Sequence, residues 1–287
     1  MTVRELAAAA ADRLKRARIP EPRREAESLL AHALGRDGSW VMAHPEALVA
    51  KSDDRQFLRS VERRARREPY AYIVGEKWFF ERRFLVTKDV LIPRPETEVL
   101  VEAILARVPD AAATILDVGT GSGAIGLTLA AERPKTKAVL YDVSKGALDV
   151  ARANALTLKL GRRARLVRLD ILRQALPEPK GRPAIVAVNL PYLPLAAWKK
   201  AMPEVRLREP KLALVSGADG LDHYRALFAR LARWKHPPDV LALEAEPGQF
   251  GELRRLALGL MPDAEIEIMK DLHGDDRVLI ASKRKRP

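Results

Sequence analysis

One short segment of this sequence carries residue types suited to chemistry on an amide or amino group. An apolar run at residues 184–188 predicts a buried strand, and Asn189, Leu190, Pro191 and Tyr192 follow it directly. The Asn189 side-chain oxygen and a backbone carbonyl of the turn can each accept one N–H of a planar NH2 group, on which the Tyr192 ring can stack. Such a nitrogen is a poor nucleophile, and two acceptors favour its pyramidal, attacking form. An ordinary turn at the end of a strand explains the same residues, so both interpretations stay open here.

A glycine-rich segment upstream predicts a ligand-binding turn. Residues 115–118 form an expected strand and residues 124–131 an expected helix, separated by Gly119, Thr120, Gly121, Ser122 and Gly123. A turn of this kind exposes backbone N–H groups at the start of a helix. Its spacing also matches the dinucleotide fingerprint, which is a weak signal by itself. Asp117 precedes the turn, where a carboxylate is unfavourable beside a pyrophosphate but favourable near a cationic ammonium group.

Acidic residues also follow the next two expected strands. The strand at residues 138–141 leads into Asp142, where a carboxylate can accept both hydroxyls of a ribose. The strand at residues 165–169 leads into Asp170 and Ile171, in a position to meet an adenine amino group. For any single aspartate a solvated loop is the simpler explanation. Because the crevice of an open α/β sheet lies at the carboxyl ends of its strands, the series predicts one site, formed by Asp117, Gly119, Asp142, Asp170 and Asn189.

The elements that position these residues form an α/β pattern that starts at residue 114. After the strand at 184–188 we expect a helix at 219–234, a strand at 240–243 ending in Glu244, a helix at 248–258, and strands at 264–269 and 277–280. Apolar residues at helical spacing predict three helices before this region, at residues 3–18, 23–34 and 53–67. The arginines at the end of the third suit a helix dipole or an anionic partner.

Between these regions, residues 76–87 have the aromatic and β-branched pattern of a short hairpin. Two prolines then make residues 91–98 a rigid extended segment, with Thr97 expected as a helix N-cap. We therefore expect a helical substrate-recognition domain at residues 1–74, a hairpin linker at 75–92 and an α/β domain at 93–287.

Composition limits the classes of protein to consider. The 287 residues are 47% hydrophobic and include no Cys, which excludes disulfides, thiol nucleophiles and zinc–thiolate sites. The five His are scattered without an HExxH pair, so no structural metal is expected. No run approaches the ~18 apolar residues of a membrane helix, and the N-terminus does not read as a signal peptide, so we expect a cytoplasmic protein.

The formal net charge of +13 favours an acidic partner such as nucleic acid, a ribonucleoprotein or an acidic protein. A general compositional bias explains the charge equally well. The basic tail at residues 283–286 is expected to be a frayed, solvated end.

Longer stretches of the chain resemble one protein family. EPYAYIVGEKWFF, FLVTKDVLIPRPETEVLVE, ILDVGTGSGAIGLTLA and LREPKLALVSGADGL are similar to segments of the HemK/PrmC family of protein-glutamine methyltransferases. The resemblance covers nearly the whole chain, including its helical N-terminal part. It implies the class I methyltransferase fold, a Rossmann-like seven-stranded sheet, with a small N-terminal helical domain.

The resemblance also implies an activity and a site. The activity is methylation, by S-adenosyl-L-methionine, of the side-chain amide nitrogen of the Gln in the Gly-Gly-Gln motif of class 1 peptide chain release factors. Transfer would be direct and in line, without a metal. The cofactor-binding residues would be Asp117, Gly119, Thr120, Gly121, Ser122, Gly123, Asp142, Asp170, Ile171 and Asn189. The target glutamine would be held by Asn189, Leu190, Pro191 and Tyr192, and residues 93–97 would border the cofactor pocket.

The chain departs from the family pattern at two positions. Leu190 replaces the first proline of Asn-Pro-Pro-Tyr, and Ile171 stands where an aromatic residue is frequent. Asn-Leu-Pro-Tyr also occurs in adenine-amino methyltransferases, so RNA or DNA methylation is one alternative, although 5% aromatic residues is little for base stacking. A ribosomal protein as the glutamine substrate is another. A non-catalytic adaptor is the third, and the intact Asn189–x–Pro191–Tyr192 motif disfavours it. Direct nucleic-acid binding is compatible with the charge but not required.

Overall fold

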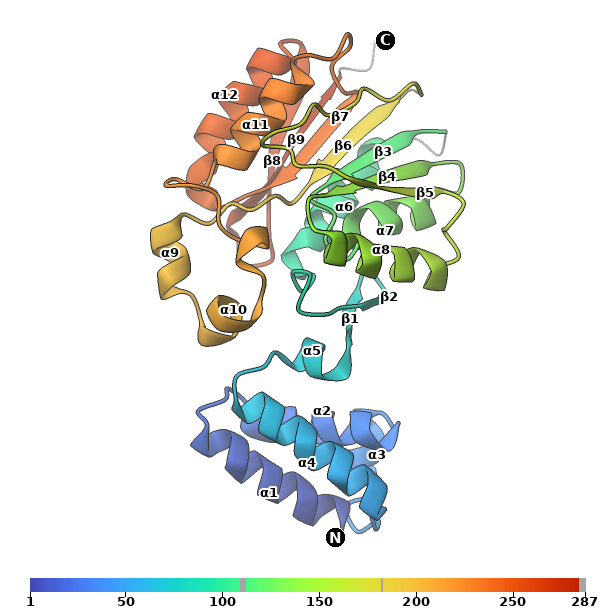
Figure 1. Ribbon diagram of the computed structural model, residues 1–287, viewed down its shortest axis with the longest axis vertical. Helices are drawn as coiled ribbons and strands as arrows, with labels where there is room; N and C mark the ends of the chain where they lie inside the picture. Colours follow the sequence, from blue (N-terminus) through green and yellow to red (C-terminus); the bar gives the residue numbers. More distant parts are fainter. Residues whose placement is uncertain (109–111, 182, 284–287) are drawn as a thin grey trace. The chain divides into compact units, whose positions relative to one another are not determined.

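The computed structural model describes residues 1–108, 112–181 and 183–283, which divide into two compact units (Figure 1). The first comprises Met1–Glu76 together with Met202–Arg208. The second comprises Lys77–Ala201 and the described residues from Glu209 onwards. Three residues of the basic tail expected to be frayed, Arg284, Lys285 and Arg286, lie outside the described residues.

The first unit is a helical bundle, as its hydrophobic spacing predicts. Its helices are α1 (Val3–Arg16), α2 (Pro22–Leu34), α3 (Gly38–Ala43), α4 (Lys51–Ala65) and α5 (Tyr70–Val74). A capping box between Thr2 and Glu5 starts α1, and Gly35, at φ 61°, ends α2 in the left-handed region that glycine favours. The apolar faces of α1, α2 and α4 meet in one core, in which Leu6 and Phe57 are buried.

A helix distant in sequence completes this unit. In α10 (Pro203–Arg208), the buried Glu204 accepts hydrogen bonds from Arg67 at 2.9 Å and Arg64 at 3.3 Å. Arg64 also pairs with Glu25 at 2.9 Å. Two arginines of the cluster that ends α4 are therefore held inside the unit, because a buried carboxylate needs charged partners.

The second unit contains a seven-stranded sheet in the order β5-β4-β3-β6-β7-β9-β8. The strands are β3 (Thr114–Val118), β4 (Lys137–Asp142), β5 (Ala164–Arg168), β6 (Ala184–Val188), β7 (Val240–Glu244), β8 (Ala264–Lys270) and β9 (Asp276–Lys283). The first five are parallel, and β9 is antiparallel to both β7 and β8. The expected fold class, a seven-stranded α/β sheet with a small helical N-terminal region, is confirmed.

Helices cover both faces of the sheet (Figure 1). One core cluster joins the sheet to α6 (Glu96–Arg107), α7 (Ala124–Glu132) and α8 (Lys145–Thr157). The other joins it to α11 (Asp222–Leu231) and α12 (Phe250–Leu260). Strands β6 and β7 are buried along their whole length, which explains their uninterrupted apolar sequences. Shorter elements are α9 (Leu195–Lys200), η1 (Lys211–Ala213) and η2 (Pro247–Gln249).

Several local expectations need correction. Thr97 is not an N-cap, because α6 begins at Glu96 after Pro95 and therefore includes Thr97 in its first turn. Helix α11 begins at Asp222, three residues after the expected Asp219. Helices α3, α5, α8, α9 and α10 were not expected from the sequence. No helix among the described residues is long and apolar enough to span a membrane.

The hairpin of β1 (Glu76–Phe79) and β2 (Arg82–Leu85) was expected to be a linker. From Lys77 onwards it instead belongs to the second unit. Phe79 and Phe84 are 1% and 0% exposed, and their rings meet edge to face at 6.1 Å within the core that contains α6. Asn154 of α8 fixes the hairpin with two hydrogen bonds to the Leu85 backbone, at 2.7 and 3.0 Å.

Replacing a core residue of this hairpin should therefore destabilise the second unit. We expect Phe84→Ala to lower the free energy of unfolding by about 3–5 kcal/mol, the usual range for removing a buried phenylalanine ring. Trp78→Ala is the matched control, because Trp78 lies on the same hairpin but is 60% exposed, and should change the value by less than about 1 kcal/mol. Denaturant unfolding measures both. Equal, small effects would show that the hairpin is a linker after all.

Candidate active site

The glycine-rich turn after β3 forms one wall of the site. Its Gly119, Gly121 and Gly123 all have positive φ, at 77°, 55° and 84°. A Cβ atom on Gly119 would lie 2.9 Å from Leu190 Cδ2, closer than two side chains can approach. Glycine at position 119 thus allows both the turn and the close approach of the segment that follows β6.

Asp117 lies beneath this turn and is completely buried. Its Oδ2 accepts hydrogen bonds from Thr120 Oγ1 at 2.7 Å and from the Gly126 amide at 2.9 Å. Burial raises the pKa of Asp117 to about 6, and these two donors oppose that shift. The structure therefore places Asp117 where it fixes the shape of the turn, and not at the surface where a ligand would bind.

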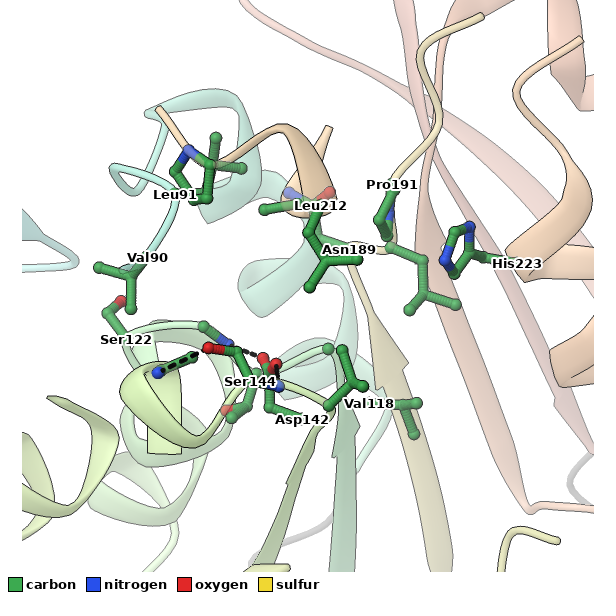
Figure 2. A pocket seen from close by; sticks show the side chains of 18 of the residues that line it. Val90, Leu91, Val118, Ser122, Asp142, Ser144, Asn189, Pro191, Leu212 and His223 are labelled. Carbon is green, nitrogen blue, oxygen red and sulfur yellow. Dashed lines mark hydrogen bonds between the residues drawn. The ribbon is translucent and has the colours of Figure 1, made fainter. Parts of the chain in front are cut away.

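Asp142 ends β4 and stands beside the turn. Its Oδ2 accepts from the Gly121 amide and its Oδ1 from the Ser144 amide, both at 2.9 Å. Burial raises the pKa of Asp142, and these backbone donors counteract it. A carboxylate has about four lone-pair directions, so two bonds leave it able to accept from a ligand as well. Figure 2 shows Asp142 and Ser144 at the edge of the same cavity as Asn189.

The cavity has a volume of about 200 Å³ and lies at the carboxyl ends of the parallel strands. Ten of the predicted site residues line it: Gly119, Thr120, Gly121, Ser122, Asp142, Asp170, Ile171, Asn189, Leu190 and Pro191. Asp117, Gly123 and Tyr192 do not. The Gly123 amide donates within the turn, to the Thr120 carbonyl at 2.8 Å.

Two chain segments that are far apart in sequence close one side of the cavity. Pro93 and Arg94 line it from the segment before α6, and Pro210 and Leu212 from the segment around η1. The buried Glu209 joins the two segments. It accepts from Arg94 Nη2 at 2.5 Å and from the Ile92 amide at 3.2 Å. The Glu209 contacts were not anticipated, because their partners lie more than 100 residues away.

His223 of α11 also lines the cavity and was not predicted (Figure 2). Its Nδ1 lies 2.7 Å from Ser216 Oγ, which also accepts from the His223 amide at 3.0 Å. Burial lowers the pKa of His223, which favours the neutral ring. Its only sequence signal is its position two residues after the LREPKLALVSGADGL stretch.

Asn189 follows β6 and faces the cavity with its amide orientation fixed. Its Nδ2 donates to Thr97 Oγ1 at 3.1 Å, which leaves Oδ1 available as an acceptor. Tyr192 is held from behind. Its hydroxyl donates to Glu244 Oε1 at 3.4 Å, and its carbonyl accepts from Gln249 Nε2 at 2.9 Å. Burial, with the nearby Glu244 charge, raises the pKa of Tyr192 well above its ordinary value, so the phenol stays neutral.

These features fit an adenosyl ligand with an amino-acid group. The turn offers backbone N–H groups, Asp142 offers a carboxylate for hydroxyls, and Leu169, Ile171 and Leu190 offer apolar surface for a ring. Among the described residues no cluster of three or more His, Asp or Glu side chains could hold a metal ion.

Comparisons with known proteins find two matching domains and a similar fold. Residues 5–75 match the PrmC N-terminal domain, and residues 95–191 match the methyltransferase small domain. In fold, the chain is similar to the N-terminal domain of human METTL16 in complex with SAH, with a TM-score of 0.52 and 12% identity over 89% of this chain and 94% of that one. This structural similarity shows a shared methyltransferase fold, and at such low sequence identity it says nothing about the substrate.

Relatives closer in sequence decide the family. The release factor glutamine methyltransferase of Cereibacter sphaeroides is 42% identical, over 95% of each chain. The enzyme of the same name from Nitratidesulfovibrio vulgaris is 38% identical, over 98% of this chain and 95% of its own. These matches confirm the resemblance to the HemK/PrmC family and give the chain its methyl donor, S-adenosyl-L-methionine. The chain belongs to the family of release factor glutamine methyltransferases.

Proposed function

We propose that this protein methylates the side-chain amide nitrogen of the Gln in the Gly-Gly-Gln motif of class 1 peptide chain release factors. The observation that carries the proposal is the Asn189 amide, whose NH2 is bound by Thr97 so that its oxygen is left to accept an N–H at the cavity. The names of the curated relatives support the choice of substrate. The proposal includes a substrate-recognition role for the helical N-terminal unit and action in the cytoplasm, where release factors meet the ribosome.

The cofactor would be held by the residues that line the cavity. The turn at residues 119–122 would contact its amino-acid part, Asp142 its ribose, and Asp170, Ile171 and His223 its adenine. When bound, S-adenosyl-L-methionine supplies a methyl group already activated by its sulfonium. The protein would then have to hold the glutamine amide nitrogen in line with that methyl group and prevent other orientations of the amide.

Asn189 and the turn after it would orient that amide. The Asn189 oxygen would accept one N–H and the Leu190 carbonyl the other, which favours the pyramidal nitrogen that attacks. Pro191 restricts the backbone of this turn. The Leu190 side chain is buried and packs towards Gly119, so the departure from Asn-Pro-Pro-Tyr changes the packing of the turn but keeps a carbonyl at position 190.

Removing the Asn189 acceptor should abolish most turnover. We expect Asn189→Ala to lower kcat by about 10²- to 10³-fold, as for one lost preorganised group in other active sites. The dissociation constant for S-adenosyl-L-methionine should stay within about twofold, because most of its proposed contacts are elsewhere. Transfer of labelled methyl to a release factor and calorimetry measure the two effects. An unchanged kcat would refute the role of Asn189.

Removing the Asp142 carboxylate should act on cofactor binding. We expect Asp142→Ala to weaken binding of S-adenosyl-L-methionine at least about tenfold, because the ribose acceptor and the Gly121 anchor are both lost. Asp149→Ala is the control, since Asp149 is an exposed acid on α8, and should leave binding unchanged. Circular dichroism checks that both variants fold. Calorimetry giving wild-type affinity for Asp142→Ala would contradict the assignment.

The substrate itself is tested by competition between acceptors. Labelled S-adenosyl-L-methionine is offered with a release factor carrying Gly-Gly-Gln, the same factor with Gly-Gly-Ala, ribosomal RNA and ribosomal proteins. We expect label only on the Gly-Gly-Gln factor. Label on RNA or on a ribosomal protein would leave the catalytic fold in place and replace the proposed substrate.

A further inference from the structure

A buried acid next to Asn189 has no part in the chemistry described above. Glu244 ends β7 and is 1% exposed. Strands β6 and β7 are parallel, with Val188 opposite Leu243, so Asn189 and Glu244 are the next pair along the two strands. Glu244 Oε2 has no hydrogen-bond partner among the described residues, which is costly for a buried carboxylate.

A single hydroxyl connects the acid to the amide. Thr97, in the first turn of α6, is 4% exposed, and its Oγ1 accepts from Asn189 Nδ2 at 3.1 Å. The same hydroxyl lies beside the Glu244 carboxylate, where it lowers the pKa of that acid. The Tyr192 hydroxyl donates to Glu244 Oε1 at 3.4 Å. The acid thus accepts a hydrogen bond from Tyr192, which follows Asn189 in the chain, and neighbours Thr97, which holds the Asn189 amide.

The hydroxyl has one proton, and its direction decides which end of the amide faces the cavity. While Glu244 is ionised it is the strongest acceptor nearby, so the Thr97 hydroxyl proton points towards it and the hydroxyl oxygen accepts from the Asn189 NH2. The Asn189 oxygen then faces the cavity. A protonated Glu244 can donate to Thr97, which would then donate to the Asn189 oxygen. The NH2 would turn towards the cavity and meet the NH2 of the substrate.

We propose that Glu244 is a positioning residue, whose carboxylate sets the orientation of the Asn189 amide through the Thr97 hydroxyl. The importance of this orientation for turnover rests on the proposed glutamine-amide substrate, which needs an acceptor at Asn189. The orientation itself belongs to the free protein and is measurable without any substrate.

The acid is placed to titrate near neutral pH. Burial raises the pKa of Glu244 to about 7, opposed by the Thr97 hydroxyl, by Arg277 of β9 and by the Tyr192 hydroxyl, while Glu96 of α6 raises it further. Tyr224 of α11 faces it as a neutral phenol, because burial raises the pKa of that residue as well. The Asn189 oxygen is therefore expected to face the cavity above about pH 7, and this orientation is lost as the pH falls through that value.

The sequence offers an internal control for observing the amide directly. The chain contains two asparagines, Asn154 and Asn189. The Asn154 amide is fixed by the Leu85 and Ser122 carbonyls, at 3.0 and 2.8 Å, and contacts no titrating group through them. Selective 15N-asparagine labelling should thus give two side-chain NH2 signals. We expect the Asn189 signal to shift with a midpoint near pH 7 and the Asn154 signal to stay constant.

Two variants separate the relay from general stability. Thr97→Val removes the hydroxyl, and Glu244→Gln keeps the shape of the acid but cannot titrate. In both, the Asn189 NH2 signal should no longer respond to pH. Glu246→Gln is the matched control, because it removes a negative charge from the same segment, two residues after Glu244. In this variant the Asn189 NH2 signal should respond to pH as it does in the wild type. Glu244→Gln is expected to fold, so a lost pH response in this variant does not reflect unfolding. A carboxyl with a raised pKa loses stability as pH rises, so the variant should be at least as stable as wild type at about pH 8.

Activity gives the second readout. Wild-type kcat on the Gly-Gly-Gln factor should fall about tenfold per pH unit below the Glu244 pKa, whereas Glu244→Gln should show no such limb. Thr97→Val should lower kcat at least about tenfold, with little change in cofactor affinity. An Asn189 signal that ignores pH in wild type, or an acid limb retained in Glu244→Gln, would overturn the proposal. If the signal titrates as expected but no factor is methylated, the relay stands and the proposed substrate fails.

Discussion

The parallel pairing of β3 with β6 is the constraint on which the site depends. Their register ends with Val118 opposite Val188, so the glycine-rich turn and Asn189 leave the sheet side by side. From β3 the chain adds β4 and β5 on one side of the sheet and then returns to add β6 and β7 on the other. A crevice opens between β3 and β6, because the connections that leave these two strands run to opposite sides of the sheet. The approach is so close that a side chain at position 119 would collide with Leu190. Turn, amide and cavity are therefore consequences of one strand pairing.

Buried acids hold the segments around this pairing, and their hydrogen bonding separates two roles. Asp117 and Asp142 accept backbone amides of the turn and the next helix, so their negative charge maintains loop shape. Glu209 does the same for the segment before α6. Glu244 differs because one of its oxygens has no partner among the described residues and its strongest neighbours are side chains that can rotate. A group of this kind can change protonation state without dismantling the fold, which suits it to orient another side chain.

Fewer of the positive charges are free to bind a partner than the net charge of the protein suggests. The net value of +13 invites an anionic partner, and the arginines that end α4 are an obvious candidate surface. In the structure Arg64 and Arg67 bind Glu204, Arg64 also binds Glu25, and Arg63 pairs with Glu68 at 2.5 Å. Arg64 and Arg67 thereby attach α10 to the helical unit. Part of the positive charge therefore has a structural use, and net charge alone does not define a recognition surface.

The sequence by itself determined the features that depend on neighbouring residues. Apolar spacing identified the first helices and all seven strands, because period and burial are encoded locally. The motif at residues 189–192 and the glycine-rich turn were recognisable because each is continuous in the chain. Their convergence at one edge followed from the general rule for parallel strands, and the observed cavity agrees with it.

Tertiary structure alone decided the rest, since the partners lie far apart in sequence. Thr97 looked like a helix cap, yet its hydroxyl binds an amide 92 residues away. The hairpin looked like a linker, yet its phenylalanines complete a core, and α10 joins a unit that ends in sequence more than 100 residues earlier. Glu244 was visible only as the end of a strand. Its meaning comes from which hydroxyl it faces, because the direction of a hydrogen bond is set by all of its neighbours and not by its own segment.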